Sequence, residues 1–224
     1  MKTKKSLFFL LLAMLAPITL TAQIQDEEVT RKTGGFFGVG LSLSQLGDYD
    51  MGLNTTIEVG YKYQVSSFLL MPSLRYTTRK TTQTIDYGNI ASALGTWSGK
   101  YEAKLNPDYL EIPIRLGYQY ETGKIDIRPY IGPYIAYGTT GSVEATLETG
   151  TPGGSTKKSK TSNDFFGDNT SRFDAGFLIG AQVGFQTSGG RGFVQLEYNA
   201  GMTKPSKNSD NKWKFFLFTI GVGV

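Results

Sequence analysis

The stretch that decides the fold reads Asp108-Tyr-Leu-Glu-Ile-Pro-Ile-Arg-Leu-Gly-Tyr-Gln-Tyr120, then Glu121-Thr-Gly-Lys124, then Ile125-Asp-Ile-Arg-Pro-Tyr-Ile-Gly-Pro-Tyr-Ile-Ala-Tyr137. It predicts two alternating strands joined by a tight turn, both longer than a usual strand of about five or six residues. One face is mainly aliphatic, and the other carries Glu111, Arg115, Asp126 and Arg128 in mid-strand. An aliphatic face toward lipid and a polar face toward a lumen are typical of strands that cross a bilayer.

The N-terminus has the pattern of a secretory signal peptide. Lys2, Lys4 and Lys5 precede an apolar run over residues 7–16, and a cleavage position follows Ala22. That run is shorter than the roughly 20 residues of a spanning helix. The sequence therefore predicts three segments: a signal peptide at 1–22, a flexible periplasmic lead-in at 23–34, and a barrel domain at 35–224.

The composition narrows the function classes. Without residues 1–22 the chain keeps 20 of its 23 Lys and Arg against 19 Asp and Glu, a net charge of about +1 that does not favour nucleic acid. The absence of Cys excludes disulfides, so stability must come from packing or sheet closure. A mean hydropathy of −0.22 is compatible with a barrel, whose polar lumen offsets its apolar exterior.

Alternation recurs along the chain, and the strands expected from it lie at 36–44, 53–64, 68–79, 109–120, 125–137, 173–186, 194–202 and 213–224. Connections at 65–67, 121–124 and 188–191 are short; the others are longer, and 81–103 and 138–170 are expected to be polar loops. This pattern predicts an all-β, eight-stranded antiparallel up-and-down transmembrane β-barrel with short periplasmic turns and longer extracellular loops. The expected location is the outer membrane of a diderm bacterium.

Two further features concern the strands themselves. Aromatic residues fall in the outward register near both ends, as in the interfacial girdles of a spanning barrel; they are Tyr61, Tyr63, Tyr76, Tyr118, Tyr120, Tyr137, Phe173 and Phe185. Because proline removes a ladder donor, Pro113, Pro129 and Pro133 are expected to cause bulges or locally opened pairing.

Three segments carry a resemblance to a known family: Tyr109-Leu-Glu-Ile-Pro-Ile-Arg-Leu-Gly-Tyr118, Gly132-Pro-Tyr-Ile-Ala-Tyr137 and Asp174-Ala-Gly-Phe-Leu-Ile-Gly-Ala-Gln-Val-Gly184. With them the mature chain resembles the PorT-like outer-membrane β-barrel family. The resemblance implies an outer-membrane barrel, and only part of that family is linked to protein secretion. The chain departs from a common barrel pattern by ending in Val224 rather than in an aromatic residue.

The inward register holds a set of charges, which are Glu58, Lys62, Arg75, Glu111, Arg115, Asp126, Arg128, Asp174 and Glu197. These residues could line a selective pore or a ligand cavity, or they could pair with one another and fill the lumen. Eight strands enclose a space just wide enough for side chains, and near-equal charges favour pairing. A charge-paired plug is the preferred interpretation.

No catalytic, cofactor-binding or metal motif stands out, and the chain lacks the His that many barrel enzymes use as a base. The long loops are then the expected working surface. Phe165 and Phe166 could form an exposed contact or fold back on the rim, and Lys157, Lys158 and Lys160 could meet lipopolysaccharide phosphates. We expect no cofactor, outer-membrane lipids including lipopolysaccharide as partners, and possible protein partners through the loops.

The sequence thus predicts a non-enzymatic outer-membrane barrel with a structural or interaction role, possibly accessory to a secretion or envelope complex. The alternative is a ligand-binding or narrow-pore barrel. A secreted lipocalin-like barrel would have an apolar interior, which the charged inward register disfavours.

Overall fold

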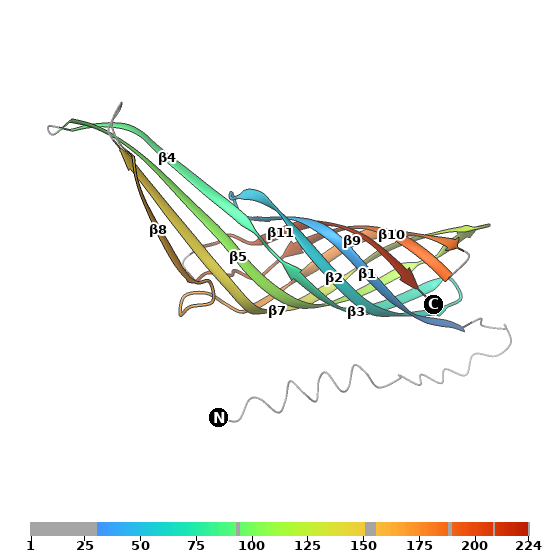
Figure 1. Ribbon diagram of the computed structural model, residues 1–224. Coiled ribbons are helices and arrows are strands. Elements are labelled where there is room, and N and C mark those ends of the chain that lie inside the picture. The colour runs from blue at the N-terminus through green and yellow to red at the C-terminus, as the bar shows by residue number, and fades with distance from the viewer. Residues whose placement is uncertain (1–30, 93–94, 151–155, 188–189, 208, 224) are drawn as a thin grey trace, which may run out of the picture.

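The computed structural model describes residues 31–92, 95–150, 156–187, 190–207 and 209–223 (Figure 1). The signal peptide predicted at 1–22 and most of the lead-in lie outside these residues. Strand β1 begins at Arg31, within the predicted lead-in, and its first residues pair with β2, Arg31 opposite Val65.

Eight strands close a ring. They are β1 (Arg31–Leu46), β2 (Asp50–Val65), β3 (Phe68–Thr78), β5 (Gly95–Tyr118), β7 (Ile125–Gly150), β9 (Phe173–Thr187), β10 (Gly190–Gly201) and β11 (Trp213–Gly223). Each pairs antiparallel with the next around the ring, and β11 pairs with β1, with Leu41 opposite Phe218. The short β6 (Tyr120–Thr122) continues beside β7. The predicted eight-stranded antiparallel barrel is confirmed, and closure leaves the ring without an open edge.

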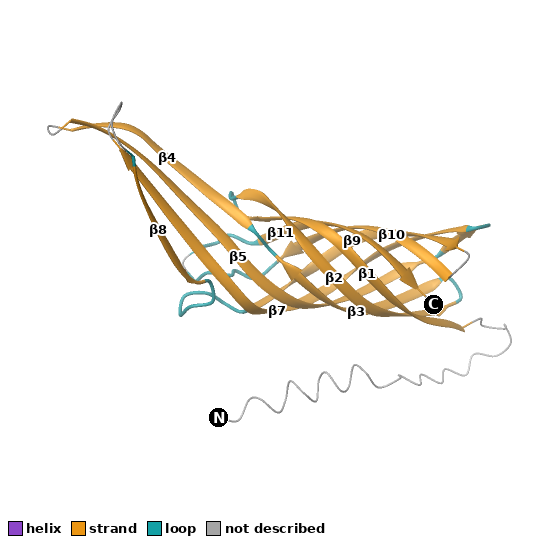
Figure 2. Cartoon of the chain, in the orientation of Figure 1, coloured by secondary structure: helices purple, strands orange, loops and turns teal. Residues whose placement is uncertain are grey.

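Two further strands form a sheet that extends beyond the ring. β4 (Thr81–Ser92) pairs with the first half of β5, and β8 (Lys157–Asp164) pairs with the second half of β7. Because β5 and β7 stay paired beyond the barrel, the result is a four-stranded sheet in the order β4-β5-β7-β8 (Figures 1 and 2). The prediction of polar loops at 81–103 and 138–170 is therefore wrong over most of both ranges.

The two ends of the barrel differ. At one end β2 and β3 are joined by a two-residue turn with Ser66 at φ 53°, and Gly123 adopts φ +61° in the turn before β7. β1 starts and β11 ends at this same end, where Phe36 lies opposite Gly223. The four-stranded extension leaves from the other end. Short turns and both chain ends on one side are typical of the periplasmic side, so the extension is extracellular.

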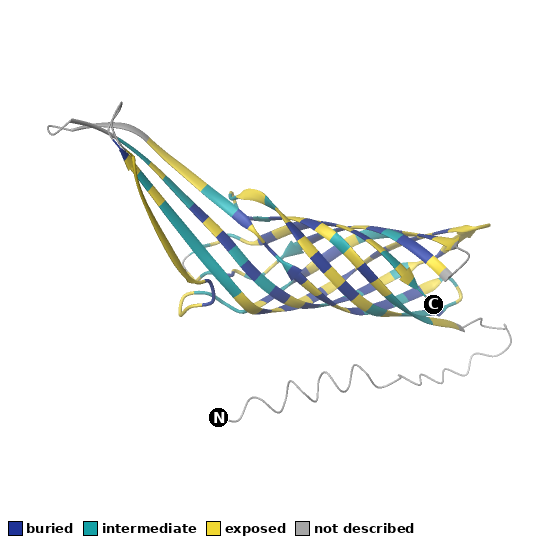
Figure 3. Ribbon diagram, in the orientation of Figure 1, coloured by how far each residue is buried: buried dark blue, intermediate teal, exposed yellow. Residues whose placement is uncertain are grey.

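Side chains alternate strictly along the barrel wall, which gives the checkered pattern of Figure 3. Outward positions are aliphatic or aromatic and exposed, including Leu53, Val59, Leu116, Ile131, Ile179, Leu196, Phe218 and Ile220, whereas inward positions are buried and largely polar. This arrangement is the inverse of a water-soluble protein, and only lipid can cover such an exterior. The chain is an outer-membrane β-barrel.

The outward aromatic residues at Tyr61, Tyr118 and Tyr120 lie near the periplasmic turns, and Tyr76, Tyr137 and Phe173 lie near the extracellular end. None of the described residues forms a helix long and apolar enough to cross a membrane.

The prolines affect the two neighbouring ladders differently. The β5–β7 ladder lacks the pairs Ile114–Pro133 and Arg115–Gly132 while its register is unchanged, so the predicted opening is confirmed next to Pro113 and at Pro133. Pro129 and Pro133 pair with β9 without interruption, so no bulge forms on that side. The register shift of the β5–β7 ladder lies instead between Asp108 and Tyr109, where the strands leave the barrel.

Candidate functional site

A chain of alternating acids and arginines crosses the lumen. In order it contains Glu58, Arg115, Glu197, Arg75, Glu111, Arg79 and Asp174, and it draws on β2, β3, β5, β9, β10 and the residue after β3. All seven side chains are at most 3% exposed. The residues come from far apart in the sequence and meet because alternate positions of every strand face the same narrow interior.

Each arginine in this ion chain bridges two carboxylates. Arg115 Nε lies 2.6 Å from Glu197, and its Nη atoms contact Glu58. Arg75 Nε donates to Glu111 at 2.7 Å and its Nη1 to Glu197 at 2.6 Å. These contacts are charge-assisted hydrogen bonds, the stronger class of hydrogen bond in proteins.

The third bridge lies nearest the extracellular end. Arg79 Nη2 donates to Glu111 at 2.6 Å and Nη1 to Asp174 at 2.6 Å. Arg79 was not among the residues predicted for the lumen, although it shares the inward parity of Arg75. The observed strand ends at Thr78, but the strand predicted at 68–79 includes Arg79, so the alternation alone could have identified it as a lumen residue.

Neutral side chains form further hydrogen bonds to the ion chain. Tyr130 donates to Glu197 and Tyr134 to Asp174, each at 3.1 Å, and Ser73 donates to Glu58. Asn199 accepts from Arg75 at 3.2 Å. Buried charges are costly unless paired and hydrogen-bonded, and here each carboxylate of the ion chain has at least one guanidinium contact.

An aromatic layer lies between the ion chain and the extracellular mouth. Tyr109, Trp213 and Phe215 are buried, and the Arg79 guanidinium carbon lies 4.2 Å from the centre of the Tyr109 ring and 4.5 Å from that of Phe215. A cation over an aromatic face is attracted by the ring quadrupole. The ion chain and, on its extracellular side, the aromatic layer therefore fill the extracellular half of the lumen.

Phe165 and Phe166 belong to this layer. They are 5% and 7% exposed, and Phe166 meets Tyr109 edge-on with ring centres 5.7 Å apart. The prediction of an exposed loop contact is wrong, and the alternative that the pair folds back on the rim describes its position. The Phe166 ring can fold back onto the rim because residue 138 is glycine, since a Cβ at this position would lie 2.0 Å from the ring.

The remaining predicted charges form a second group near the periplasmic end. Arg128 Nε lies 2.6 Å from Asp126, and Arg191, a residue not predicted for the lumen, approaches the same carboxylate at 3.8 Å. Lys62 lies close to them but makes no ion pair with any described residue. The structure thus divides the nine predicted lumen charges between two groups, six in the ion chain and three at the periplasmic mouth.

Most charged side chains of the extension lie on the face opposite the apolar ones, and Lys157, which pairs with Thr149 in the register of Leu147, is an exception. Strand register places Ile85, Tyr101 and Leu147 on one face, continuous with the lumen wall. The opposite face holds three exposed ion pairs, Lys104–Glu102 at 2.9 Å, Lys158–Glu148 at 2.6 Å and Lys160–Glu144 at 3.0 Å. Two of the lysines predicted to meet lipopolysaccharide are thus paired with glutamates of β7.

The described residues contain no group of three or more acidic, His or Cys side chains arranged to hold a metal ion. The chemistry that the lumen supports is mutual charge pairing.

Comparison with known protein families gives no matching family model, and no curated protein matches the chain. Solved structures give weak similarities. One is Ail, the attachment invasion locus protein of Yersinia pestis, at 11% identity over 86% of this chain and 99% of that chain, with a TM-score of 0.35. Others are neisserial surface protein A, at 12% identity over 86% and 98% with a TM-score of 0.35, and the N-terminal β-barrel domain of Pseudomonas aeruginosa OprF, at 11% over 86% and 97% with 0.30. The fold assignment rests on the strand pairing, and the resemblance to PorT-like proteins stays a prediction.

Proposed function

We propose that this chain is a non-enzymatic outer-membrane barrel that acts as an interaction protein, with its extracellular sheet binding another protein of the cell envelope. The observation that carries the proposal is the lumen, which is crossed by a buried ion chain. A lumen filled in this way favours activity on the outer surface over passage through the barrel.

The extension has the features of a contact surface. It projects beyond the barrel and presents an apolar face on which Ile85, Tyr87 and Leu147 are exposed. Exposed apolar surface outside lipid marks interaction sites. The opposite face is covered by paired charges, which favour solvent. Because only one face is apolar, we expect the partner to bind there, on the face that continues the lumen wall, through an apolar surface of its own.

A secretion or envelope complex would be the setting if the resemblance to the PorT-like family holds. The alternative of a narrow pore has less support, because conduction would require the alternating ion pairs to separate. A ligand-binding role has one specific observation in its favour, the cationic group at the periplasmic mouth.

Co-purification from outer membranes in mild detergent tests the proposal. Both hairpins of the extension must be shortened together, at residues 83–103 and 143–163, because β5 and β7 pair with each other there and removal of one hairpin would expose a new edge. We expect a stoichiometric partner with the wild-type chain and none with the shortened one.

Matched point variants locate the contact. Ile85→Ser with Leu147→Ser alters the apolar face, and Glu144→Gln with Lys160→Gln alters the charged face of the same sheet. We expect the first pair to release the partner and the second to retain it. A chain that purifies alone in every sample, or a partner retained by the shortened chain, would contradict the proposal.

A further inference from the structure

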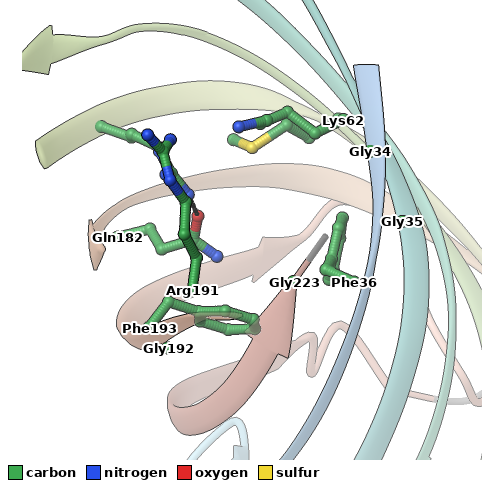
Figure 4. Close-up of a pocket in the computed structure, with 11 residues that line it drawn as sticks. Gly34, Gly35, Phe36, Lys62, Gln182, Arg191, Gly192, Phe193 and Gly223 are labelled. Carbon is green, nitrogen blue, oxygen red and sulfur yellow. Dashed lines mark hydrogen bonds between the residues drawn. The ribbon is translucent and has the colours of Figure 1, made fainter. Parts of the chain in front are cut away.

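The periplasmic mouth of the barrel contains a pocket. Figure 4 shows Lys62, Gln182 and Arg191 around one space, with the rings of Phe36 and Phe193 beside it. The empty space is about 370 Å³ when counted out to open solvent, and its enclosed part holds no more than a water molecule. A ligand would therefore lie mostly in the open mouth.

Positive charge is in excess around this space. Lys62, Arg128 and Arg191 face it, and among the described residues Asp126 is the one carboxylate that contacts them. Asp126 Oδ1 is 2.6 Å from Arg128 Nε, whereas Oδ2 is 3.8 Å from Arg191. The neighbouring Lys32 and Glu121 form an ion pair at 3.6 Å that has no net charge. Within the described part of the chain three cations share one anion, which leaves two positive charges in excess.

One cation also lacks a partner. Arg128 Nη1 donates to Gln182 at 2.6 Å and the same guanidinium is paired with Asp126, but Lys62 Nζ makes no hydrogen bond or ion pair within the described part of the chain. Arg128 is 5% exposed. Like charges held together away from bulk water repel one another, and a bound anion would offset that repulsion.

The sequence holds these groups in place. A Cβ on Gly184 would lie 2.6 Å from Asp126 Oδ1 and 2.9 Å from Arg128 Nη2, so the pair can lie against the backbone only because residue 184 is glycine. Gln182, two residues earlier on β9, fixes the other end of the guanidinium. At the pocket wall, Phe36 and Phe193 meet edge-on with ring centres 5.9 Å apart. Arg128 is therefore fixed by packing, whereas the Arg191 side chain is 43% exposed at the mouth.

We propose that this pocket binds a small periplasmic anion that carries a carboxylate or a phosphate group. Arginine matches both groups through its planar set of donors, and lysine adds a point charge. The site lies at the end of the barrel opposite the extracellular extension and does not depend on the role proposed for that sheet.

Calorimetric titration of the folded, full-length mature barrel in mild detergent tests the site. The probes are inorganic phosphate and succinate, each at constant ionic strength set with sodium chloride, because screening alone changes surface electrostatics. We expect saturable binding of at least one probe. Lys62→Met and Arg191→Gln should each weaken it at least about tenfold, the effect of losing one charge-assisted hydrogen bond.

Lys124→Gln is the matched control, since it removes the same charge from a turn at the same end but outside the pocket. It should bind as the wild type does, and heat-modifiable migration on a gel verifies that every variant is folded. Phosphate binding alone would identify phosphates as the ligand class, and succinate binding alone would identify carboxylates.

Three results would overturn the proposal. The first is the absence of binding of both probes to the folded wild type, and the second is equal weakening by Lys124→Gln. The third is binding that emerges only after Asp26, Glu27 and Glu28 are replaced by amides, since the pocket would then serve this chain's own acidic residues instead of a periplasmic ligand.

Discussion

Replacing Arg115 by methionine removes the one cation that contacts Glu58 among the described residues. Methionine keeps the unbranched shape of the side chain but has no donor. Glu197 retains its 2.6 Å contact with Arg75 in this variant, whereas Glu58 keeps only the hydroxyl of Ser73. Because Glu58 is 1% exposed, water cannot compensate.

The expected loss is large. Removal of one partner of a buried ion pair costs about 3–5 kcal/mol, since the other charge stays buried without compensation. Glu58→Gln should cost less, about 1–2 kcal/mol, because Arg115 keeps Glu197 and the amide oxygen still accepts a hydrogen bond. The double variant has no stranded carboxylate, so it should recover about 2 kcal/mol of the loss caused by Arg115→Met alone.

Urea titration of the folded barrel in phospholipid vesicles measures these free energies of unfolding. Fluorescence of the two tryptophans, of which Trp213 is buried, and heat-modifiable migration on a gel give two independent signals for the transition. The account of the lumen would be refuted if Arg115→Met stayed within about 1 kcal/mol of the wild type. It would also be refuted if adding Glu58→Gln lowered the stability of Arg115→Met further.

The orientation of the barrel can be read with single cysteines, since the chain has none of its own: Ser159→Cys in β8 should react with an impermeant maleimide on intact cells, and Ser67→Cys only after the outer membrane is opened. The reverse pattern would invert the assigned topology. Gly132→Ala should destabilise the barrel by about 1–3 kcal/mol, because its Cβ would lie 1.8 Å from the Ile114 carbonyl oxygen, whereas Gly99→Ala, with 3.6 Å to its nearest atom, should stay within about 0.5 kcal/mol in the same urea titration. Phe166→Ala should cost about 3–5 kcal/mol and should speed proteolysis of the extension, and unchanged digestion would show that the aromatic layer does not hold the rim.

The barrel strands were predictable from the sequence because lipid imposes a strict rule on them. Leu110, Ile112, Ile114 and Leu116 must be apolar to face the bilayer, and Glu111 and Arg115 can be charged only on the opposite side. The same parity placed Glu58 and Glu197 in the lumen. Parity identifies the side of the wall on which a residue lies, but it does not say which charges meet, since that depends on the order and stagger of strands around the ring.

The extension escaped prediction because no membrane constrains it. β8 runs Lys157-Lys-Ser-Lys-Thr-Ser-Asn-Asp164 and is exposed along its whole length, so its sequence has no apolar period. Its strand conformation comes from backbone pairing with β7, and β4 is held in the same way by β5. Polar, Ser- and Thr-rich segments of this kind are usually loops, and tertiary pairing overrides that tendency here.

The positions of Phe165 and Phe166 also required the structure. An adjacent aromatic pair in a polar segment is compatible with exposure or burial, and the outcome depends on whether a distant surface can accept the rings. Gly138 and Tyr109 provide that surface, and both become available only when β5 and β7 pair at the rim.

Ion conductance of the wild-type barrel in a planar lipid bilayer tests the central claim most directly, because the buried ion chain and the aromatic layer are inferred to seal the lumen. Insertion is verified in the same preparation by surface labelling of Ser159→Cys. We expect no conductance steps above the bilayer background from inserted protein. Steady, reproducible conductance from folded wild-type protein would contradict a sealed lumen and would favour the narrow-pore alternative.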